Sequence, residues 1–358
     1  MARLPRDIQD ALDRLEPAIR NAFLQAIDQI ASAAQMKRLV AMIEEGRIEE
    51  AIEALRIEQG FFSPLNDIVR TAYIDGGALV LSGLKLKDPY HGDAFILGFD
   101  GRHVRAERWV RDRSSDLIVE IVDQQRNMAR TVIREGLQAG RNPRAVALDI
   151  VGRTNRPTGK REGGFIGLTD QQVRWAMNAE EQLRNAHVPG GIDPVTGKRK
   201  PSAGSLYLDR GRRDARFDAR VREAMKSGKP ITEADIQRMV IRYRERLKKF
   251  RGDLIAENET LTALRSGQME GFRQLVDTGK VRPDQIEREW SDTGDSRTRH
   301  DHREMRGQKV RGIDTPFTFP DGTQAMFPGD VSLGSPAKNT IRCRCIQHVK
   351  IRSDLLRD

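Results

Sequence analysis

Apolar residues recur every three or four positions over long stretches of the chain, and this spacing is the strongest constraint on its fold. Near the N-terminus they are Ile8, Leu12, Leu15, Ile19, Phe23, Ile27 and Ile30. A later stretch repeats the pattern at Ile236, Met239, Tyr243, Leu247, Phe250 and Leu254. Spacing of this kind places one apolar stripe along a helix, and the second stretch is close to a heptad. The sequence therefore predicts long α-helices.

Capping residues mark where several helices begin. Residues 114–116 (Ser-Ser-Asp) form a candidate N-cap for a helix that Gly140 ends. Thr169 and Gln172 have the spacing of a capping box. Thr232 is the candidate cap of the long helix that carries the heptad-like stripe. These signals divide the helical pattern into separate segments.

Three short segments have strand character instead. Residues 94–104 (AFILGFDGRHV) contain an apolar run and an Asp-Gly turn, which predicts a small hairpin. Residues 317–327 (FTFPDGTQAMF) predict two short strands around a Pro-Asp-Gly turn. Residues 341–351 (IRCRCIQHVKI) alternate, which predicts a terminal strand with Cys343 and Cys345 on one face. We therefore expect a mainly α protein with a small α+β C-terminal module.

These patterns suggest three regions. Residues 1–115 are an N-terminal helical region with a small hairpin, and residues 116–290 are a helical body with a Gly/Pro/basic loop at 186–214. Residues 291–358 form the α+β module. No apolar run approaches the roughly 18 residues that span a bilayer, and the first ten residues lack the apolar segment of a signal peptide. We expect a soluble protein made in the cytosol, with no membrane partner established.

The charge balance points to an acidic partner. The chain has 62 Lys and Arg, 48 of them Arg, against 52 Asp and Glu, a net charge of +10. Arginine favours bidentate contacts with phosphates or carboxylates. The densest basic group is predicted on the long helix: Arg238, Arg242, Arg244, Arg246, Lys248 and Lys249. These cations are candidate contacts to nucleic-acid phosphates, although many arginines on solvated helix faces could equally pair with the acidic residues.

Histidine and cysteine, both rare in this chain, gather near its C-terminal end. Zinc is typically bound by four thiolate or imidazole groups, and His302, Cys343 and Cys345 supply three of them. The candidates for the fourth ligand are His348, Asp295 and His300. Equally, the two thiols can be packed core residues, with His302 bonded to the backbone and Arg297 or Arg299 clamping Asp292 or Asp295.

A catalytic interpretation has less support. The His300-x-His302 pair with Asp295 and Glu304 offers the residue types of a metal-dependent nuclease or hydrolase. However, the chain has no Gly-rich phosphate loop, no His-Glu-x-x-His motif and no nucleophile elbow. We therefore expect no enzyme activity and assign no catalytic residues.

An ordered set of motifs resembles a known family. The segment RGDLIAENET starting at Arg251 is followed by WSDTGDSRTRHDH from Trp290 to His302, by Gly307, by a Pro-Gly-Asp turn and by Cys343-Arg344-Cys345. This order resembles the phage head morphogenesis, or minor head protein, family typified by phage Mu protein F. The signature residues on this basis are Trp290, Asp295, Arg297, Arg299, Gly307 and Pro328.

The resemblance implies a function based on binding. Such proteins are low-copy virion components that associate with the portal protein at the capsid vertex and with other head proteins. They assist head assembly and DNA packaging or ejection, and would be found in the host cytoplasm during assembly. Non-specific contact with DNA fits this role; the alternatives are the nuclease or hydrolase above and a non-enzymatic DNA-binding protein. The family pattern selects His302 over His300, whereas Arg342 departs from the Asn or His that often precedes Cys-Arg-Cys.

Overall fold

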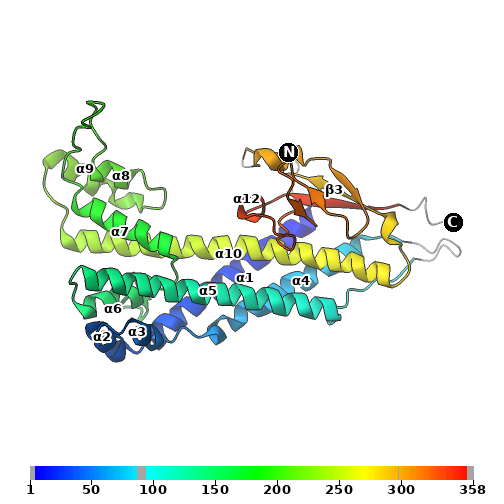
Figure 1. Ribbon diagram of the computed structural model, residues 1–358, viewed down its shortest axis with the longest axis horizontal. Helices are drawn as coiled ribbons and strands as arrows, with labels where there is room; N and C mark the ends of the chain where they lie inside the picture. Colours follow the sequence, from blue (N-terminus) through cyan, green and yellow to red (C-terminus); the bar gives the residue numbers. More distant parts are fainter. Residues whose placement is uncertain (1–4, 87–93, 297, 353–358) are drawn as a thin grey trace. The chain divides into compact units, whose positions relative to one another are not determined.

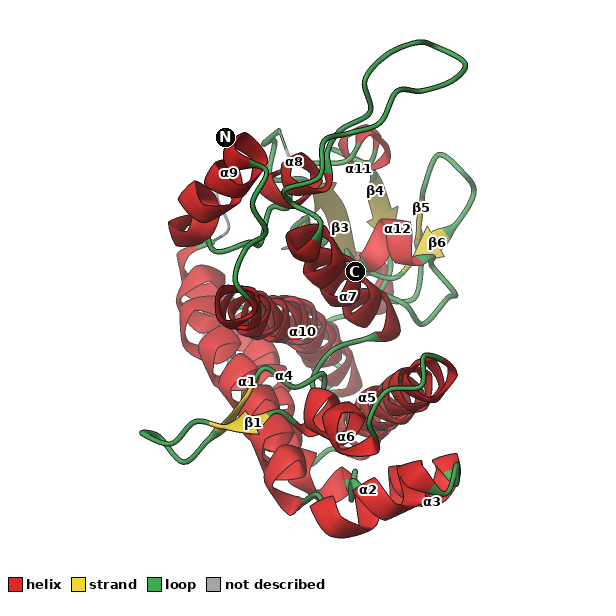
Figure 2. Ribbon diagram, turned by 90° about the vertical axis from the view of Figure 1, so that its left-hand side faces the viewer, coloured by secondary structure: helices red, strands yellow, loops and turns green. Residues whose placement is uncertain are grey.

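A computed structural model of the chain describes residues 5–86, 94–296 and 298–352. Helix dominates this part of the chain, and the strands are short (Figures 1 and 2). The mainly α fold with a small α+β C-terminal region is as the sequence predicts. None of the helices among the described residues has the length and apolar content needed to cross a membrane.

The helices follow one another along the chain with short strands between them. The long helices are α1 (Arg6–Ala33), α4 (Ser63–Gly83), α5 (Val104–Gln138), α7 (Asp170–Arg184) and α10 (Glu233–Asp277). The shorter ones are α2 (Met36–Glu44), α3 (Ile48–Ala54), α6 (Pro143–Val151), α8 (Ala203–Leu208), α9 (Asp218–Ser227), α11 (His300–Glu304) and α12 (Ala337–Thr340). The strands are β1 (Arg153–Thr154), β2 (Arg161–Glu162), β3 (Ile286–Ser291), β4 (Lys309–Arg311), β5 (Phe317–Thr318), β6 (Gln324–Ala325) and β7 (Ile346–Ile351).

The chain divides into two compact units, each built from segments that are separate in sequence. Unit 1 comprises residues 1–21, 63–116 and 253–358, and unit 2 comprises residues 22–62 and 117–252. Three of the four division points fall inside α1, α5 and α10, so each of these helices contributes residues to both units. The domain boundaries predicted from the sequence near residues 115 and 290 stay predictions.

In unit 1, glycines bring α4 and α10 into backbone contact. A Cβ atom added to Gly267 would lie 1.9 Å from the carbonyl oxygen of Tyr73, and one added to Gly76 would lie 2.0 Å from that of Leu264. Only glycine allows so close an approach. The C-terminal end of α10 then packs Met269, Phe272 and Leu275 into an apolar cluster with residues of α4 and the sheet.

The sheet of unit 1 has the order β4-β3-β7, with both pairs antiparallel. The central strand β3 alternates buried and half-exposed residues, which is the pattern of a strand with one face on a core. Ile286, Arg288 and Trp290 are the buried positions, each 0 % exposed. The predicted hairpin at 317–327 forms as β5 and β6.

Unit 2 contains two helical groups and a short hairpin. Helix α2 packs on α3 and α6, and α8 packs on α7 and α9. The predicted capping box is present, because Thr169 accepts from the Gln172 backbone and the Gln172 side chain accepts from the backbone N–H of Thr169. Thr232 accepts from the Asp235 N–H at 3.2 Å at the start of α10. The apolar stripe of α10 in this unit is buried from Ile236 to Leu247.

Two predictions for the first half of the chain are wrong, a hairpin and the start of a helix. No hairpin forms over 94–104: the backbone of Asp100 exchanges hydrogen bonds of 2.9 and 3.0 Å with the side chain of Gln274, in place of a partner strand. Helix α5 begins at Val104, well before the candidate cap at 114–116. Ser114 is buried inside that helix, where serine costs only a few tenths of a kcal/mol, while Val110 extends the apolar spacing.

The terminal strand is also shorter than predicted. It begins at Ile346, and Cys343 and Cys345 lie in the segment that precedes it. The backbone of Arg342 adopts φ 55°, which is incompatible with a strand. Its N–H instead donates to the side chain of Asn258 at 2.8 Å. The two cysteines are therefore positioned by a loop rather than by strand alternation.

The close helix approach in unit 1 yields a stability prediction. We expect Gly267→Ala to lower the free energy of unfolding by about 2 kcal/mol or more, because the new methyl group would displace the backbone of α4. Gly83→Ala is the matched control, since a Cβ at this last residue of α4 meets nothing within 4 Å. Thermal and denaturant unfolding of both variants would check this, and equal stability of the two would contradict the packing described.

Candidate metal centre

Three rare side chains meet inside unit 1. The Nδ1 atom of His302 lies 3.3 Å from the Sγ atom of Cys345 and 3.6 Å from that of Cys343. The ligand atoms of all three lie within 4.8 Å of one another, and each residue is at most 3 % exposed. The structure thus brings together the three residues selected from the sequence.

The short helix α11 separates the two histidines. His302 faces the interior, whereas His300 is exposed and its Nδ1 lies 2.9 Å from a carboxylate oxygen of Glu304. Residues two apart on a helix point to different sides, which explains the contrast. Glu304, a candidate acid in the catalytic interpretation, is therefore paired with the exposed histidine rather than with the buried one.

A buried arginine positions the two cysteines. The guanidinium of Arg265, on α10, donates to the carbonyl oxygen of Cys343 at 2.9 Å and to that of Cys345 at 2.6 Å. Burial lowers the pKa of Arg265, and the nearby cysteine sulfurs oppose this shift. One side chain thereby holds both ends of the Cys-Arg-Cys segment against the helix.

Aromatic rings close the other side of the cluster. The Trp290 ring packs edge-on against those of Phe317 and Phe319, at centroid distances of 5.3 and 5.4 Å. The His302 ring lies 5.5 Å from Phe319. The same apolar cluster includes Cys343 and Cys345. Because the two sulfurs are buried beside aromatic rings, unmatched charge on them would be costly.

The two thiols have different acidities. The hydrogen bond from Cys345 holds the pKa of Cys343 well below the ordinary thiol value, against the effect of burial. The same bond, followed by burial, raises the pKa of Cys345. Of the two thiols, that of Cys343 is therefore the more acidic.

The geometry also fits a tetrahedral zinc ion. With Zn–S and Zn–N distances of about 2.3 and 2.05 Å, sulfur and nitrogen ligands of one ion lie about 3.6 Å apart. The two observed separations, 3.3 and 3.6 Å, are close to that edge length. A cavity of about 20 Å³ adjoins the three side chains, and about 10–15 Å³ is enough for one water molecule. The donor set could hold zinc structurally, with a small molecule such as water at the fourth position.

None of the candidate fourth ligands completes the site. His348 is exposed on β7, and His300 is exposed on α11. Asp295 lines the small cavity, but its carboxylate accepts from Thr298 at 3.2 Å and from Arg344. Within the described residues, only His302, Cys343 and Cys345 form a group of ligand atoms close enough for one ion.

The uncharged signature residues support this cluster from the backbone. Trp290 is fully buried on β3. Gly307 adopts φ 78°, a conformation that favours glycine, and its N–H donates to the Trp290 carbonyl at 2.9 Å. Pro328 is buried in the loop after β6. These three residues shape the turn and the core around the aromatic rings.

Among the described residues, Asp292 and Asp295 pair with arginines other than Arg299. Asp295 pairs with Arg344, and Asp292 pairs with Arg306 at 2.6 Å. Arg299 is exposed and donates to the backbone carbonyl of Ile341. The predicted clamp from Arg299 to an aspartate is therefore wrong. Arg297 lies outside the described residues.

Burial divides the predicted basic group on α10. Four of its members are exposed: Arg238, Arg242, Arg246 and Lys249. Arg244 and Lys248 are only 5 % and 8 % exposed. Arg244 lies 3.2 Å from carboxylate oxygens of Asp149 and Glu180, and Lys248 lies 2.8 Å from Glu245. The expectation of one solvent-facing group is wrong for Arg244 and Lys248, since they share the buried side of the helix with Leu247.

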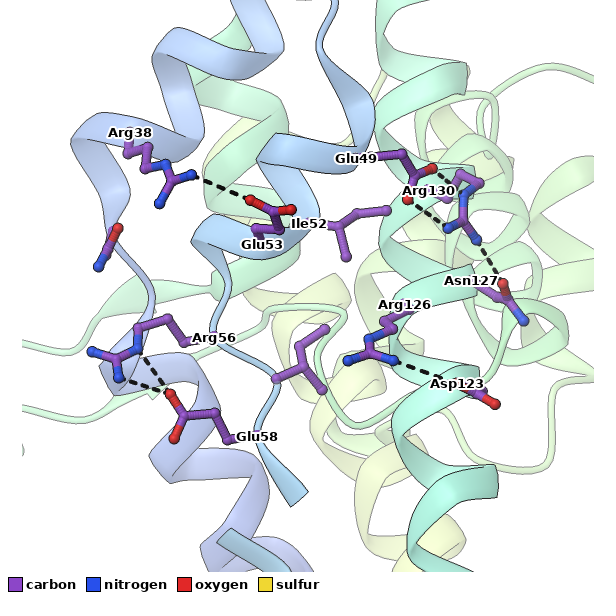
Figure 3. Close-up of a pocket in the computed structure, with 12 residues that line it drawn as sticks. Arg38, Glu49, Ile52, Glu53, Arg56, Glu58, Asp123, Arg126, Asn127 and Arg130 are labelled. Carbon is purple, nitrogen blue, oxygen red and sulfur yellow. Dashed lines mark hydrogen bonds and ion pairs between the residues drawn. The ribbon is translucent and has the colours of Figure 1, made fainter. Parts of the chain in front are cut away.

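A pocket in unit 2 is electrically balanced. It has a volume of about 830 Å³ and lies between α2, α3 and α5. Figure 3 shows arginines on its walls, each joined to a carboxylate: Arg38 to Glu53, Arg56 to Glu58, Arg126 to Asp123 and Arg130 to Glu49. Because every arginine has an acidic partner, the pocket does not favour an anionic ligand.

The cluster leads to a measurable expectation for zinc. We expect protein purified without chelators to contain about one zinc per chain, because the three donors have the spacing of one tetrahedral ion. The variant Cys343→Ser/Cys345→Ser should lose the metal, and His348→Ala, which removes an exposed imidazole on β7, should retain it. Elemental analysis of the three proteins would check this.

A metal-free core would give the opposite result. In that case the unaltered protein would contain no zinc after purification in zinc-supplemented medium. Its two thiols would then react with a thiol reagent only upon unfolding, since both are buried.

Comparison with known proteins agrees with the motif pattern. Residues 215–348 match the family model described as Phage Mu protein F like protein. The matched stretch includes α10, the aromatic cluster and all three donors of the candidate metal centre. Comparisons with curated proteins and with solved structures yield no match. Residues 215–348 of this chain therefore belong to the phage Mu protein F-like family.

Proposed function

We propose that the chain is a phage minor head protein. In this role it is a low-copy component of the virion that binds the portal protein at the capsid vertex and contacts other head proteins. It assists head assembly and DNA packaging or ejection, and is present in the host cytoplasm during assembly. The observation that supports the proposal is the family match over residues 215–348. That family relates the chain to phage heads.

The matched region offers a surface suited to a protein partner. Val331, Leu333 and Ile341 are each 47 % exposed, and they lie within one eleven-residue stretch around α12. Exposed large aliphatic side chains are candidate anchors of a protein contact. We therefore propose residues 331–341 as the portal contact.

The proposed role is binding rather than catalysis. The His302 imidazole faces two thiols and aromatic rings, and it has no carboxylate partner among the described residues. A general base usually has an orienting carboxylate. The nearest signature carboxylate, Asp295, is engaged by Arg344. These contacts favour a structural role for the cluster.

The portal contact can be tested with a paired variant. We expect Val331→Asp/Leu333→Asp to lower recovery of the protein with tagged portal protein by about tenfold or more, which corresponds to about 1.4 kcal/mol. Val104→Asp is the matched control, because Val104 is 65 % exposed in the same unit but lies outside the matched region. Co-purification from cells that express both proteins would measure the effect, with thermal melting as a check on folding.

Two results would contradict the proposal. If the unaltered protein failed to co-purify with the portal protein above a no-portal control, the partner would be wrong. If the paired variant and the Val104 control bound equally well, residues 331–341 would not be the contact surface.

A further inference from the structure

The net positive charge of the protein comes from unit 2. This unit has 33 Lys and Arg against 23 Asp and Glu, whereas unit 1 has 29 of each. Unit 2 therefore carries the entire net charge of +10. Within it, residues 141–252 hold 26 basic and 13 acidic residues. An excess of this size in one part of a chain creates a local field that attracts polyanions.

A hairpin near the start of this stretch carries four cations. Its strands β1 and β2 pair Arg153 with Glu162 and Thr154 with Arg161. At its tip, the Asn155 N–H donates to the Lys160 carbonyl at 2.7 Å and the Gly159 N–H donates to the Asn155 carbonyl at 2.8 Å. In Figure 2 the loop after β1 extends away from the neighbouring helices. We call residues 153–162 hairpin A.

A second turn in the same unit repeats this backbone. The Asp193 N–H donates to the Lys198 carbonyl at 2.8 Å, and the Gly197 N–H donates to the Asp193 carbonyl at 2.9 Å. An isolated bridge joins Ile192 to Arg199, as Thr154 joins Arg161. This turn lies in the loop between α7 and α8, at the end of α7 in Figure 1. We call residues 191–200 hairpin B.

The two hairpins share one sequence as well as one geometry. Both contain Thr-Gly-Lys-Arg, at residues 158–161 and 196–199, preceded by Asn155 in one and Asp193 in the other. The glycines have nearly equal left-handed angles, φ 68° at Gly159 and 65° at Gly197. The tips differ, since Arg-Pro in hairpin A is replaced by Pro-Val in hairpin B. The shared features are thus the turn and its positive charge, and not the apolar content.

Most cations of the hairpins are available to a ligand, whereas Arg161 is half-buried and donates to the Gly152 carbonyl at 3.1 Å. Arg153, Arg156, Lys160, Lys198 and Arg199 are exposed and lack an ion-pair partner among the described residues. Lys200 lies 3.7 Å from Asp193. Elsewhere in unit 2, many arginines are already paired, as Arg213 is with Asp218 and Arg184 with Glu233. An exposed cation without an acidic partner loses no existing ion pair when it binds an anion. Binding through such cations therefore costs the least free energy.

We propose that hairpins A and B are twin contacts for the phosphate backbone of DNA. Each presents two exposed cations on a hydrogen-bonded turn, Arg156 and Lys160 in hairpin A and Lys198 and Arg199 in hairpin B, so that binding needs little ordering of the chain. Contacts through charge alone carry no sequence information, so the binding is independent of base sequence. This inference deepens the DNA role within the proposed function, and it does not depend on the portal contact.

The hairpins differ from a nucleotide-binding loop. A phosphate loop of that kind joins a strand to a helix, so that backbone N–H groups surround the phosphate. In hairpin A the Gly-Lys pair lies between two antiparallel strands, and its turn N–H groups are used within the turn. The side chains alone therefore make the phosphate contacts, as expected for a long polyanion rather than for a bound nucleotide.

Salt-dependent DNA binding tests this proposal. The logarithm of the binding constant falls with the logarithm of salt concentration, with a slope of about 0.9 per phosphate contact on duplex DNA. We expect Arg156→Ala/Lys160→Ala and Lys198→Ala/Arg199→Ala each to reduce the slope by about two, and the fourfold variant by about four. Fluorescence anisotropy of the full chain with a random duplex of about 30 base pairs, from ~50 to ~200 mM salt, would measure it.

Matched controls separate the hairpins from general charge. Arg311→Ala/Lys350→Ala removes two exposed cations from unit 1 and should leave the slope unchanged. An equal decrease of the slope in this control would show a net-charge effect and overturn the assignment. A decrease of the slope found only in Arg242→Ala/Lys249→Ala, on α10, would also overturn it. Absence of binding at ~50 mM salt would contradict both the hairpins and the DNA role, while leaving the portal contact to its own test.

Discussion

Buried arginines that donate to backbone carbonyls hold the loops of each unit in place, and the candidate metal centre depends on one of them. Arg265 fixes the carbonyls of Cys343 and Cys345, and Arg288 donates to the carbonyls of Gly312, Thr315 and Met326. In unit 2, Arg244 and Arg251 bond in the same way to the carbonyls of Gly163 and Gly167. A guanidinium offers five donors in a fixed fork, so one side chain can satisfy several carbonyls at once.

This use of arginine separates the structural cations from the functional ones. An arginine that is buried and bonded to a loop cannot also bind a phosphate, which removes Arg244 from the predicted contact group. Exposed cations without an ion-pair partner among the described residues include Arg156 and Lys160 of hairpin A and Lys198 and Arg199 of hairpin B. The neutral unit 1 holds the cysteine cluster and the proposed portal contact, while unit 2 carries the excess charge. The proposed portal contact and the proposed DNA contacts therefore lie in different units.

The sequence predicts those features that depend on local pattern. Apolar spacing identifies the helices, and the His302–Cys343–Cys345 grouping follows from rare residue types and the family motifs. The role of Arg265 has no sequence signal, because its partners are carbonyls about 80 residues away that any residue type could supply. The hairpin expected at 94–104 fails for a similar reason, since the Gln274 side chain replaces a partner strand. The Thr-Gly-Lys-Arg repeat was visible in the sequence, but its significance needed the matching backbone of both copies.

The proposed function makes this chain a constituent of the phage head. It rests on the family match over residues 215–348 and on the cluster that those residues build. Quantitative mass spectrometry of purified particles of the phage that encodes the chain tests the claim most directly. The account predicts peptides from both units at a few copies per particle, far below the major capsid protein. Complete absence of the chain from infectious particles and from assembling heads would contradict it.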